Sequence, residues 1–258
     1  MIGLTALLLT AVAAPTPSFE EFFAEFARKR DGIEVLEARY TQKTIVPEEE
    51  LTTEGVLLYA KPRRIVLRSA DPGTCTLVDG GRVYEYEPEI KQCTIYDLED
   101  EPEADVFFFG FDADTEALRR AYDVAYFTTE NYDQGSQGIS IKPKADAAGD
   151  IYFVEVNVYL RDEDYLPYRI RVDKGEGSQV IIDVSGFQVN GSPAPEQTQL
   201  SLPEGTKIIE NDTVIETTGP EGKRIPEPVM FPAAAPSPVP QPTNAPRAAP
   251  QVDRQETP

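Results

Sequence analysis

Apolar residues near the start of this chain recur at the spacing of a helix. In residues 18–32, SFEEFFAEFARKRDG, four phenylalanines fall at i, i+3, i+4 and i+7 and form one apolar stripe. They are Phe19, Phe22, Phe23 and Phe26. Ser18 and Glu21 have the spacing of a capping box, and Gly32 is a suitable stop signal. The pattern predicts an amphipathic helix over this segment.

The spacing then changes to the alternation that is typical of β-strands. Segments with this pattern are VLEARYTQ, GVLLYA, RIVLRS, TCTLVD, RVYEYE, KQCTIYDL, GISIKP, IYFVEVNVYL, PYRIRVD and QVIIDVSGFQV. Their short connections favour an antiparallel meander, and TEALRRAYDV between the two groups of strands reads as a second helix. We therefore expect a mainly β (α+β) fold, in which one strongly curved antiparallel sheet forms an incomplete β-barrel.

The apolar face of such a sheet needs a covering layer. The candidates are the first helix and the segment FFFGF at 107–111, which together hold eight of the twelve phenylalanines. The phenylalanines of the second segment are Phe107, Phe108, Phe109 and Phe111. Two interpretations remain open: the helical lid and the sheet form an ordinary core, or they leave an apolar pocket for a guest. Gly110 slightly favours the pocket, because glycine lets the segment bend.

The Gly80–Gly81 pair predicts a hairpin turn, and the alternation of side chains on either side of it predicts which of them share a face of the sheet. A two-residue turn there pairs strand residues that point to the same side of the sheet. The predicted pairs are Asp79 with Arg82, Leu77 with Tyr84, and Cys75 with Tyr86. We infer that this face looks inward, because Val78 is the apolar exception on the other face.

The two cysteines of the chain allow a disulfide without requiring one. A four-residue EPEI turn places Cys93 opposite Tyr84, also facing inward. Cys75 and Cys93 then lie on strands two apart, about 10 Å from each other, too far for a bond. A register shift or strong curvature would close the gap, so a possible Cys75–Cys93 disulfide stays open.

Charge and composition argue against several classes of function. The net charge of -21 disfavours nucleic acid, whose phosphates attract Lys and Arg. The chain has no histidine, the commonest general base and metal ligand, so we expect no metal, no cofactor and no enzyme. A hydrolase could use the carboxylates clustered at residues 97–101, but such a run is more typical of a solvated loop.

Both ends of the chain differ in composition from its middle. MIGLTALLLTAVAA resembles an export signal with cleavage after Ala13, and it is too short to span a bilayer. Pro and Ala dominate beyond about residue 219. We expect a signal peptide at 1–13, one domain at 14–218, and a disordered Pro/Ala-rich tail at 219–258.

Several stretches, in order, resemble the periplasmic outer-membrane lipoprotein carrier family, LolA, over about residues 19–210. ARYTQK resembles the first-strand signature, and GVLLYAKPRRIVLRS is similar to the strand–"KRP"–strand corner. LVDGGRVYEYEPEIKQCTIYDL resembles the family's central hairpin region. The segments from ISIKPKAD to FQVNGSPAPEQTQLSLPEGTKII are similar to the closing meander.

The resemblance implies a LolA/LolB-like incomplete barrel with a helical lid over an apolar cavity for lipoprotein acyl chains. It implies a soluble periplasmic carrier, expected to be a monomer, that takes cargo from an inner-membrane transporter and passes it to an outer-membrane acceptor. Lys61 occupies the place of a family arginine that ties the lid to the sheet, and Arg63 or Arg64 are alternatives for this latch.

The predicted cavity and lid residues combine this resemblance with the argument from side-chain alternation. Besides the eight phenylalanines, they are Leu58, Ile65, Leu77, Tyr84 and Tyr86. An alternative function is a lipid- or lipoprotein-sensing module of the same fold that signals to a partner protein. A surface protein with the tail as a spacer is a further possibility. The outer-membrane acceptor itself is disfavoured, because no cysteine lies near residue 14 for lipidation.

Overall fold

A computed structural model describes residues 18–71, 73–97, 118–120, 122–129, 134–144 and 153–225 of the chain. The expected signal peptide and the FFFGF segment lie outside these residues, so the predictions for Phe107, Phe108, Phe109 and Phe111 are not addressed. Within the described part, the prediction of a mainly β fold with a large, curved, unclosed sheet is confirmed.

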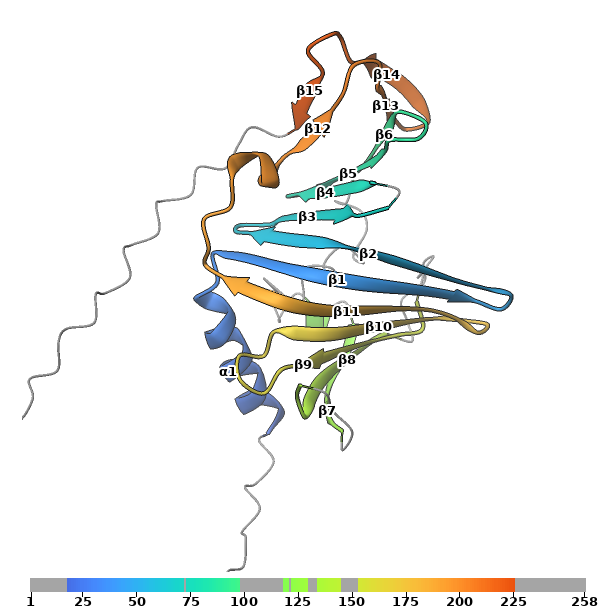
Figure 1. Cartoon of the computed structure of the whole chain (residues 1–258). Helices are drawn as coiled ribbons and strands as arrows, with labels where there is room; N and C mark the ends of the chain where they lie inside the picture. The colour runs from blue at the N-terminus through green and yellow to red at the C-terminus, as the bar shows by residue number, and fades with distance from the viewer. Residues whose placement is uncertain are drawn as a thin grey trace, which may run out of the picture.

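The main sheet has 13 strands in the order β14-β13-β6-β5-β4-β3-β2-β1-β11-β10-β9-β8-β7 (Figure 1). The first six strands of the chain are β1 Val35–Val46, β2 Glu49–Ala60, β3 Arg64–Ser69, β4 Cys75–Asp79, β5 Arg82–Glu87 and β6 Gln92–Asp97. The next five are β7 Tyr122–Thr128, β8 Gln137–Pro143, β9 Glu155–Leu160, β10 Pro167–Gly175 and β11 Ser178–Val189. Antiparallel pairing joins consecutive strands from β1 to β6 and from β7 to β11, as the short connections predicted.

The C-terminal elements add a layer that the sequence analysis did not separate from the meander. They are the 3₁₀ helix η1 Pro195–Thr198 and the strands β12 Leu200–Leu202, β13 Lys207–Glu210, β14 Thr213–Thr217 and β15 Lys223–Ile225. β13 joins β6 in parallel and β14 completes that edge, whereas β12 and β15 form a separate two-stranded sheet. Since β15 is paired, the folded part reaches at least Ile225, beyond the expected boundary at 218.

The predicted first helix is present as α1 Phe19–Asp31. The hydroxyl of Ser18 accepts the backbone N–H of Glu21 at 3.3 Å, and the Glu21 carboxylate accepts the backbone N–H of Ser18 at 2.9 Å. This is the predicted capping box. The second predicted helix ends earlier than expected, because β7 begins at Tyr122, within the segment predicted as helical. Residues 118–120 are helical, and the start of the predicted helix lies outside the described residues.

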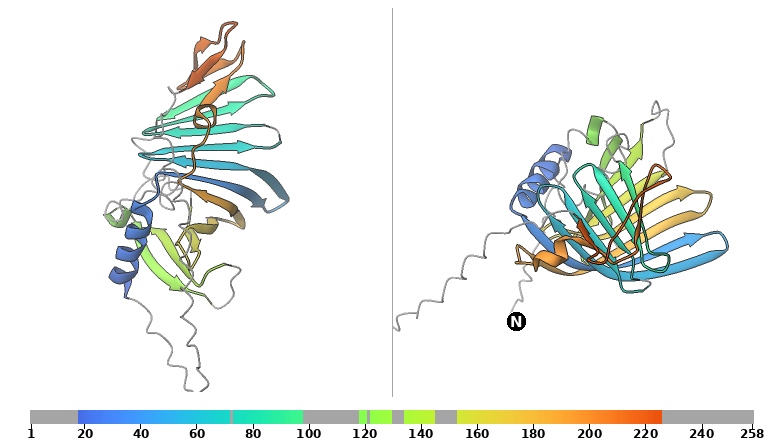
Figure 2. Two further views of the ribbon diagram at one scale, coloured as in Figure 1. Left: turned by 60° about the vertical axis from the view of Figure 1, so that its left-hand side comes forward. Right: turned by 90° about the horizontal axis from the view of Figure 1, so that it is seen from above.

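The large sheet carries apolar side chains on both of its faces. Directly opposite residues on neighbouring strands point to the same side, so the register assigns each residue to one face. We call the face on which α1 packs the inner face. It carries Tyr59 and its partner Ile65 on the first half of the sheet, and Ile139 and its partner Val158 on the second. Figure 2 shows the bend of the sheet and α1 lying at the β7–β9 end.

The opposite, outer face is covered by the C-terminal layer. Leu200, Leu202 and Ile208 are 1–2% exposed and pack against outer-face residues of β2 through β6. The buried residues of this outer cluster on those strands are Leu58, Ala60, Val66, Cys75, Leu77, Tyr86, Cys93 and Ile95. A segment far downstream in the sequence therefore closes the side of the sheet opposite α1.

Candidate functional site

The inner face is a continuous apolar surface that crosses both halves of the sheet. At the β7–β9 end it is buried under α1, and at the β1–β4 end it forms a second cluster around Leu36 and Tyr59, both 0% exposed. Between and beside these clusters, aliphatic and aromatic side chains remain only partly buried. They are Leu67, Val83, Val124, Tyr126, Ile170, Val172 and Ile182.

Most of the phenylalanine stripe of α1 is buried against the inner face. Phe22 and Phe26 are each 1% exposed, and the ring of Phe22 lies 4.5 Å from that of Tyr126 and 5.4 Å from that of Tyr165. Phe23 is also buried, whereas Phe19 is partly exposed at the outer end of the stripe. At this end α1 and the sheet pack as an ordinary core, and the apolar side chains farther along the sheet are only partly buried.

The expected orientation of the cavity wall is wrong for four of its residues. The predicted hairpin pairs form, with Asp79 opposite Arg82, Leu77 opposite Tyr84 and Cys75 opposite Tyr86. However, Leu58, Leu77, Tyr84 and Tyr86 belong to the outer cluster beneath β12 and β15. The prediction failed because both faces of these strands are apolar, so alternation alone did not identify the side that α1 covers.

Ile65 is the member of the predicted wall that does lie on the inner face. It is 3% exposed and pairs with Tyr59, whereas its neighbour Val66 pairs with Leu58 on the outer face. Val78, treated in the sequence analysis as an exception on a polar face, lies opposite Ile65 and contributes to the same inner cluster.

Cys75 and Cys93 are free, buried thiols that flank Tyr86 on the outer face. Cys93 pairs with Tyr86 rather than with Tyr84, because the turn is formed by residues 88–91 and closes through Lys91 at φ 48°. Burial raises the pKa of Cys93 to about 11 and that of Cys75 above its ordinary value. These thiols therefore form part of the outer core.

Lys61, one of the three predicted latch residues, contacts the C-terminal end of α1. Its Nζ donates to the backbone O of Asp31 at 2.7 Å and to Glu34 Oε1 at 3.4 Å. The Nε of Arg64 instead donates to Asp79 Oδ1 at 2.8 Å, within the sheet. The backbone O of Arg63 accepts the Gly80 N–H at 3.0 Å in the neighbouring turn.

Arg30 is a buried residue of α1 that the sequence analysis missed. Its side chain is 4% exposed and its guanidinium lies 4.9 Å from the ring of Phe26. The signal was present in the sequence, because Phe22, Phe26 and Arg30 follow each other at i, i+4 and i+8 on one helical stripe. A pocket of ≈ 460 Å³ is lined by Arg30, Arg28 and Lys61 together with Ala24, Phe26, Ala27 and Asp31.

A family model and one relative match this chain. Residues 31–200 match the family model described as outer membrane lipoprotein carrier protein LolA. An outer-membrane lipoprotein carrier protein from Bordetella avium (strain 197N) is 23% identical over 177 residues, covering 66% of this chain and 78% of that protein.

Solved structures with similar folds have lower sequence identity. An uncharacterised conserved protein from Thermus thermophilus is 12% identical with a TM-score of 0.48, covering 75% of this chain and 100% of that chain. A LolA superfamily protein from Nitrosomonas europaea is 13% identical with a TM-score of 0.36, and the match covers 66% of this chain and 94% of that chain. No helix in the described part of the chain has the length and apolar character needed to span a membrane.

Proposed function

Because this chain belongs to the LolA family, we propose that its inner sheet face binds the acyl chains of lipoproteins and that the protein carries them across the periplasm. The carriers of this family are binding proteins without enzymatic activity. The proposed cargo comes from an inner-membrane releasing transporter and goes to an outer-membrane acceptor.

The physical task is to shield hydrocarbon from water during transit. Each buried methylene contributes about 0.8 kcal/mol, so an acyl chain of about 15 methylenes is disfavoured in water by roughly 12 kcal/mol. A carrier needs an apolar surface that is open to cargo and that releases it again. A surface already filled by the protein's own side chains cannot serve this purpose.

The observation that carries the proposal is the run of partly buried apolar side chains on the inner face. Ile170 and Val172 on β10 and Ile182 on β11 lie on the face that α1 covers only at the β7–β9 end. These residues replace Leu58, Leu77, Tyr84 and Tyr86 as the proposed acyl-contacting wall, and Ile65 remains at its far end.

The contact between Lys61 and Asp31 supports the proposed position of the latch. It joins the C-terminal end of α1 to the β2–β3 corner through a single lysine. A latch of one hydrogen bond and a solvent-exposed ion pair is worth on the order of 1 kcal/mol, weak enough for the helix end to move when cargo enters or leaves.

The decisive experiment is transfer of a labelled lipoprotein. Inner-membrane vesicles that contain a fluorescent triacylated lipoprotein are incubated with the purified full chain, and the label released into the soluble fraction and passed to an acceptor is measured. Release that depends on the chain, followed by transfer, supports the carrier function. Absence of both release and transfer contradicts it.

A sensing module of the same fold is the second candidate. The C-terminal elements beyond residue 200 lie outside the family match, and every side chain of the edge strand β14 is exposed. An exposed edge strand can pair with a strand of another protein. Binding of lipoprotein without transfer, together with acyl-dependent capture of a periplasmic partner, would favour this alternative.

A further inference from the structure

Within the described part of the chain, Arg30 is a buried cation without a hydrogen-bond acceptor. Its Nε, Nη1 and Nη2 have no hydrogen-bond partner among these residues, although the side chain is only 4% exposed. Burial lowers the pKa of Arg30 to about 10, and the nearby carboxylate of Asp164 opposes this shift only in part. The guanidinium is therefore still positive near pH 7.

An arrangement of this kind is costly to the folded protein. A buried guanidinium presents five N–H donors, and each donor that loses water without gaining an acceptor raises the free energy of the folded state. The ring of Phe26 at 4.9 Å offers a cation–π contact, which stabilises the positive charge but gives the N–H groups no hydrogen-bond acceptor. An oxyanion would supply the missing acceptors.

The pocket beside Arg30 has room for such an anion, which the enclosed guanidinium nitrogens reach once the side chain turns toward it. Its volume is ≈ 460 Å³, and three of its lining side chains are cations: Arg28, Arg30 and Lys61. Arg28 already bonds Glu25 at 2.6 Å, and Lys61 already donates to the backbone O of Asp31. Arg30 is the one of the three whose donors have no acceptor in the described residues.

The position of the pocket connects it to the inner face. Arg30 lies in the last turn of α1 beside Phe26 of the helix stripe, and Tyr59 of the sheet is near enough to influence the pKa of its guanidinium. Tyr59 belongs to the inner cluster. A group held at Arg30 would thus lie at the boundary between the basic pocket and the apolar inner face.

We propose that this pocket binds a phosphate group, with the guanidinium of Arg30 as its principal ligand and Lys61 and Arg28 as neighbouring cations. Guanidinium matches the geometry of phosphate oxygens through paired N–H donors. The phosphate belongs either to a free ion or to the head group of an amphiphile whose acyl chains lie on the inner face. Only the second source rests on the function proposed above.

Calorimetric titration of the full chain tests this site with three probes below their micellar concentrations. The probes are inorganic phosphate, dihexanoyl phosphatidylglycerol and uncharged dihexanoylglycerol. We expect both phosphate-containing probes to bind, and Arg30→Met to weaken their binding at least tenfold. Tighter binding of the phospholipid than of phosphate identifies a lipid head group as the ligand, and equal binding identifies the free ion.

Arg119→Met is the matched control. Arg119 also lies 4.9 Å from a phenylalanine of α1, Phe19, but it pairs with Glu20 at the other end of the helix and does not line the pocket. We expect this variant to bind the probes like the parent chain. Equal weakening by both substitutions would show a general loss of positive charge and would overturn the site.

Further outcomes decide the proposal independently of the carrier function. No binding of either phosphate-containing probe to the parent chain overturns it, even if Arg30→Met fails to fold. Binding of dihexanoylglycerol as tight as that of phosphatidylglycerol also overturns it. Phosphate binding that persists in a chain with no lipoprotein transfer supports the site and contradicts only the proposed carrier function.

Discussion

The side-chain Nζ of Lys61 donates a 2.7 Å hydrogen bond to the backbone O of Asp31, the last residue of α1. The carbonyl groups of a helix C-terminus lack partners within the helix and carry partial negative charge. A lysine can satisfy one of them as a point charge, although it does not offer the planar fork of an arginine. The corner between β2 and β3 is thereby attached to α1.

Replacement of this lysine should loosen the end of the helix without unfolding the sheet. We expect Lys61→Met to lower the free energy of unfolding by about 1 kcal/mol and to accelerate amide exchange in the last turn of α1. Lys43→Met, which removes the exposed 3.2 Å pair with Glu50 far from α1, is the control. Unchanged exchange in the last turn would show that the contact does not hold the helix.

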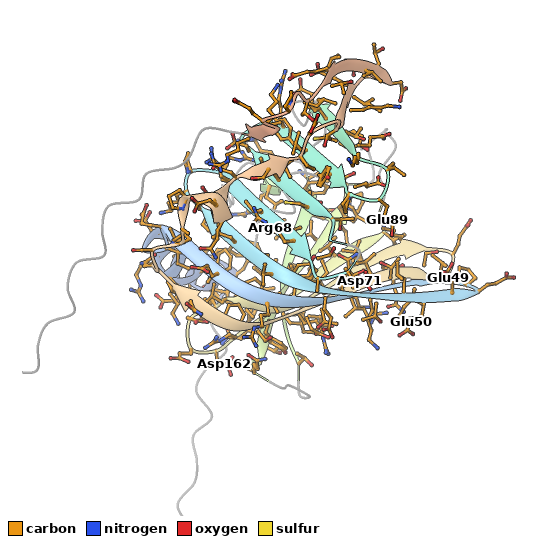
Figure 3. The ribbon with its side chains drawn as sticks, turned by 45° about the horizontal axis from the view of Figure 1, so that its top comes forward. Glu49, Glu50, Arg68, Asp71, Glu89 and Asp162 are labelled. Atoms are coloured by element: carbon orange, nitrogen blue, oxygen red, sulfur yellow. The ribbon has the colours of Figure 1, made fainter. Side chains whose placement is uncertain are left out.

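A second cation, Arg68 on β3, attaches the C-terminal layer to the outer face (Figure 3). Its Nη1 donates to the backbone O of Gln197 at 2.9 Å, and its Nη2 donates to the backbone O of Glu196 at 3.3 Å and to that of Gln199. One guanidinium therefore bonds three carbonyl groups at η1, just before the chain enters β12.

Loss of these three bonds should destabilise the protein more than loss of the Lys61 contact. We expect Arg68→Met to lower the free energy of unfolding by about 2–4 kcal/mol, and Arg68→Lys to restore only part of it. Denaturant unfolding measures both. Arg39→Met, an exposed position on the neighbouring part of the outer face, should change stability by less than about 0.5 kcal/mol. A comparable loss in all three variants would contradict the role of the three-carbonyl contact.

The two buried thiols predict a distinct chemical behaviour. Because only the thiolate reacts, a pKa of about 11 for Cys93 leaves it almost inert to aromatic disulfide reagents at pH 8. Its rate should rise about tenfold for each pH unit between about pH 8 and 10, below that pKa. Unfolding should release the thiols of both Cys75 and Cys93 in reactive form.

Val56→Cys provides a control for this measurement, because Val56 is 50% exposed on the same face and its thiol should react at once. Recovery of no thiol from the unfolded parent chain would mean that Cys75 and Cys93 are bonded after all. Rapid reaction of the native parent chain would instead show that the C-terminal layer does not cover them.

Local sequence signals predicted much of the fold. Ser18 and Glu21 specified the start of α1, and the glycine pair specified the register from Asp79 to Tyr86. The next turn was predicted one residue too early, because the turn spans residues 88–91 and ends at the left-handed Lys91. That shift moves the partner of Cys93 from Tyr84 to Tyr86 while keeping its face, since side chains alternate with period two.

The local pattern could not distinguish the inner face, which is proposed to bind acyl chains, from the outer face, which the C-terminal layer covers. Ile65 and Val66 are both buried, 3% and 1% exposed, yet they point to opposite sides of β3. The apolar outer side is buried because Leu200 and Leu202, far along the chain, pack on it. Alternation specifies which residues share a face, whereas long-range packing decides what that face contacts.

The orientation of the sheet leads to the most direct test of the inner face. Ile182 on β11 is a half-buried member of the inner cluster, and Val56 on β2 is half-exposed on the outer face. An aspartate at either position adds the same charge to a β-strand. Only at position 182 does the carboxylate lie where hydrocarbon is proposed to bind, and burying a charge beside an acyl chain is strongly unfavourable.

We therefore expect Ile182→Asp to weaken binding of a fluorescent acyl probe at least tenfold, about 1.4 kcal/mol, while Val56→Asp leaves it within twofold. Circular dichroism and thermal unfolding must show that both variants are folded before their affinities are compared. If a folded Ile182→Asp chain binds the probe like the parent, the inner face does not hold the acyl chain. If Val56→Asp loses binding equally, acyl contact extends to the outer face and the proposed distinction between the two faces is wrong.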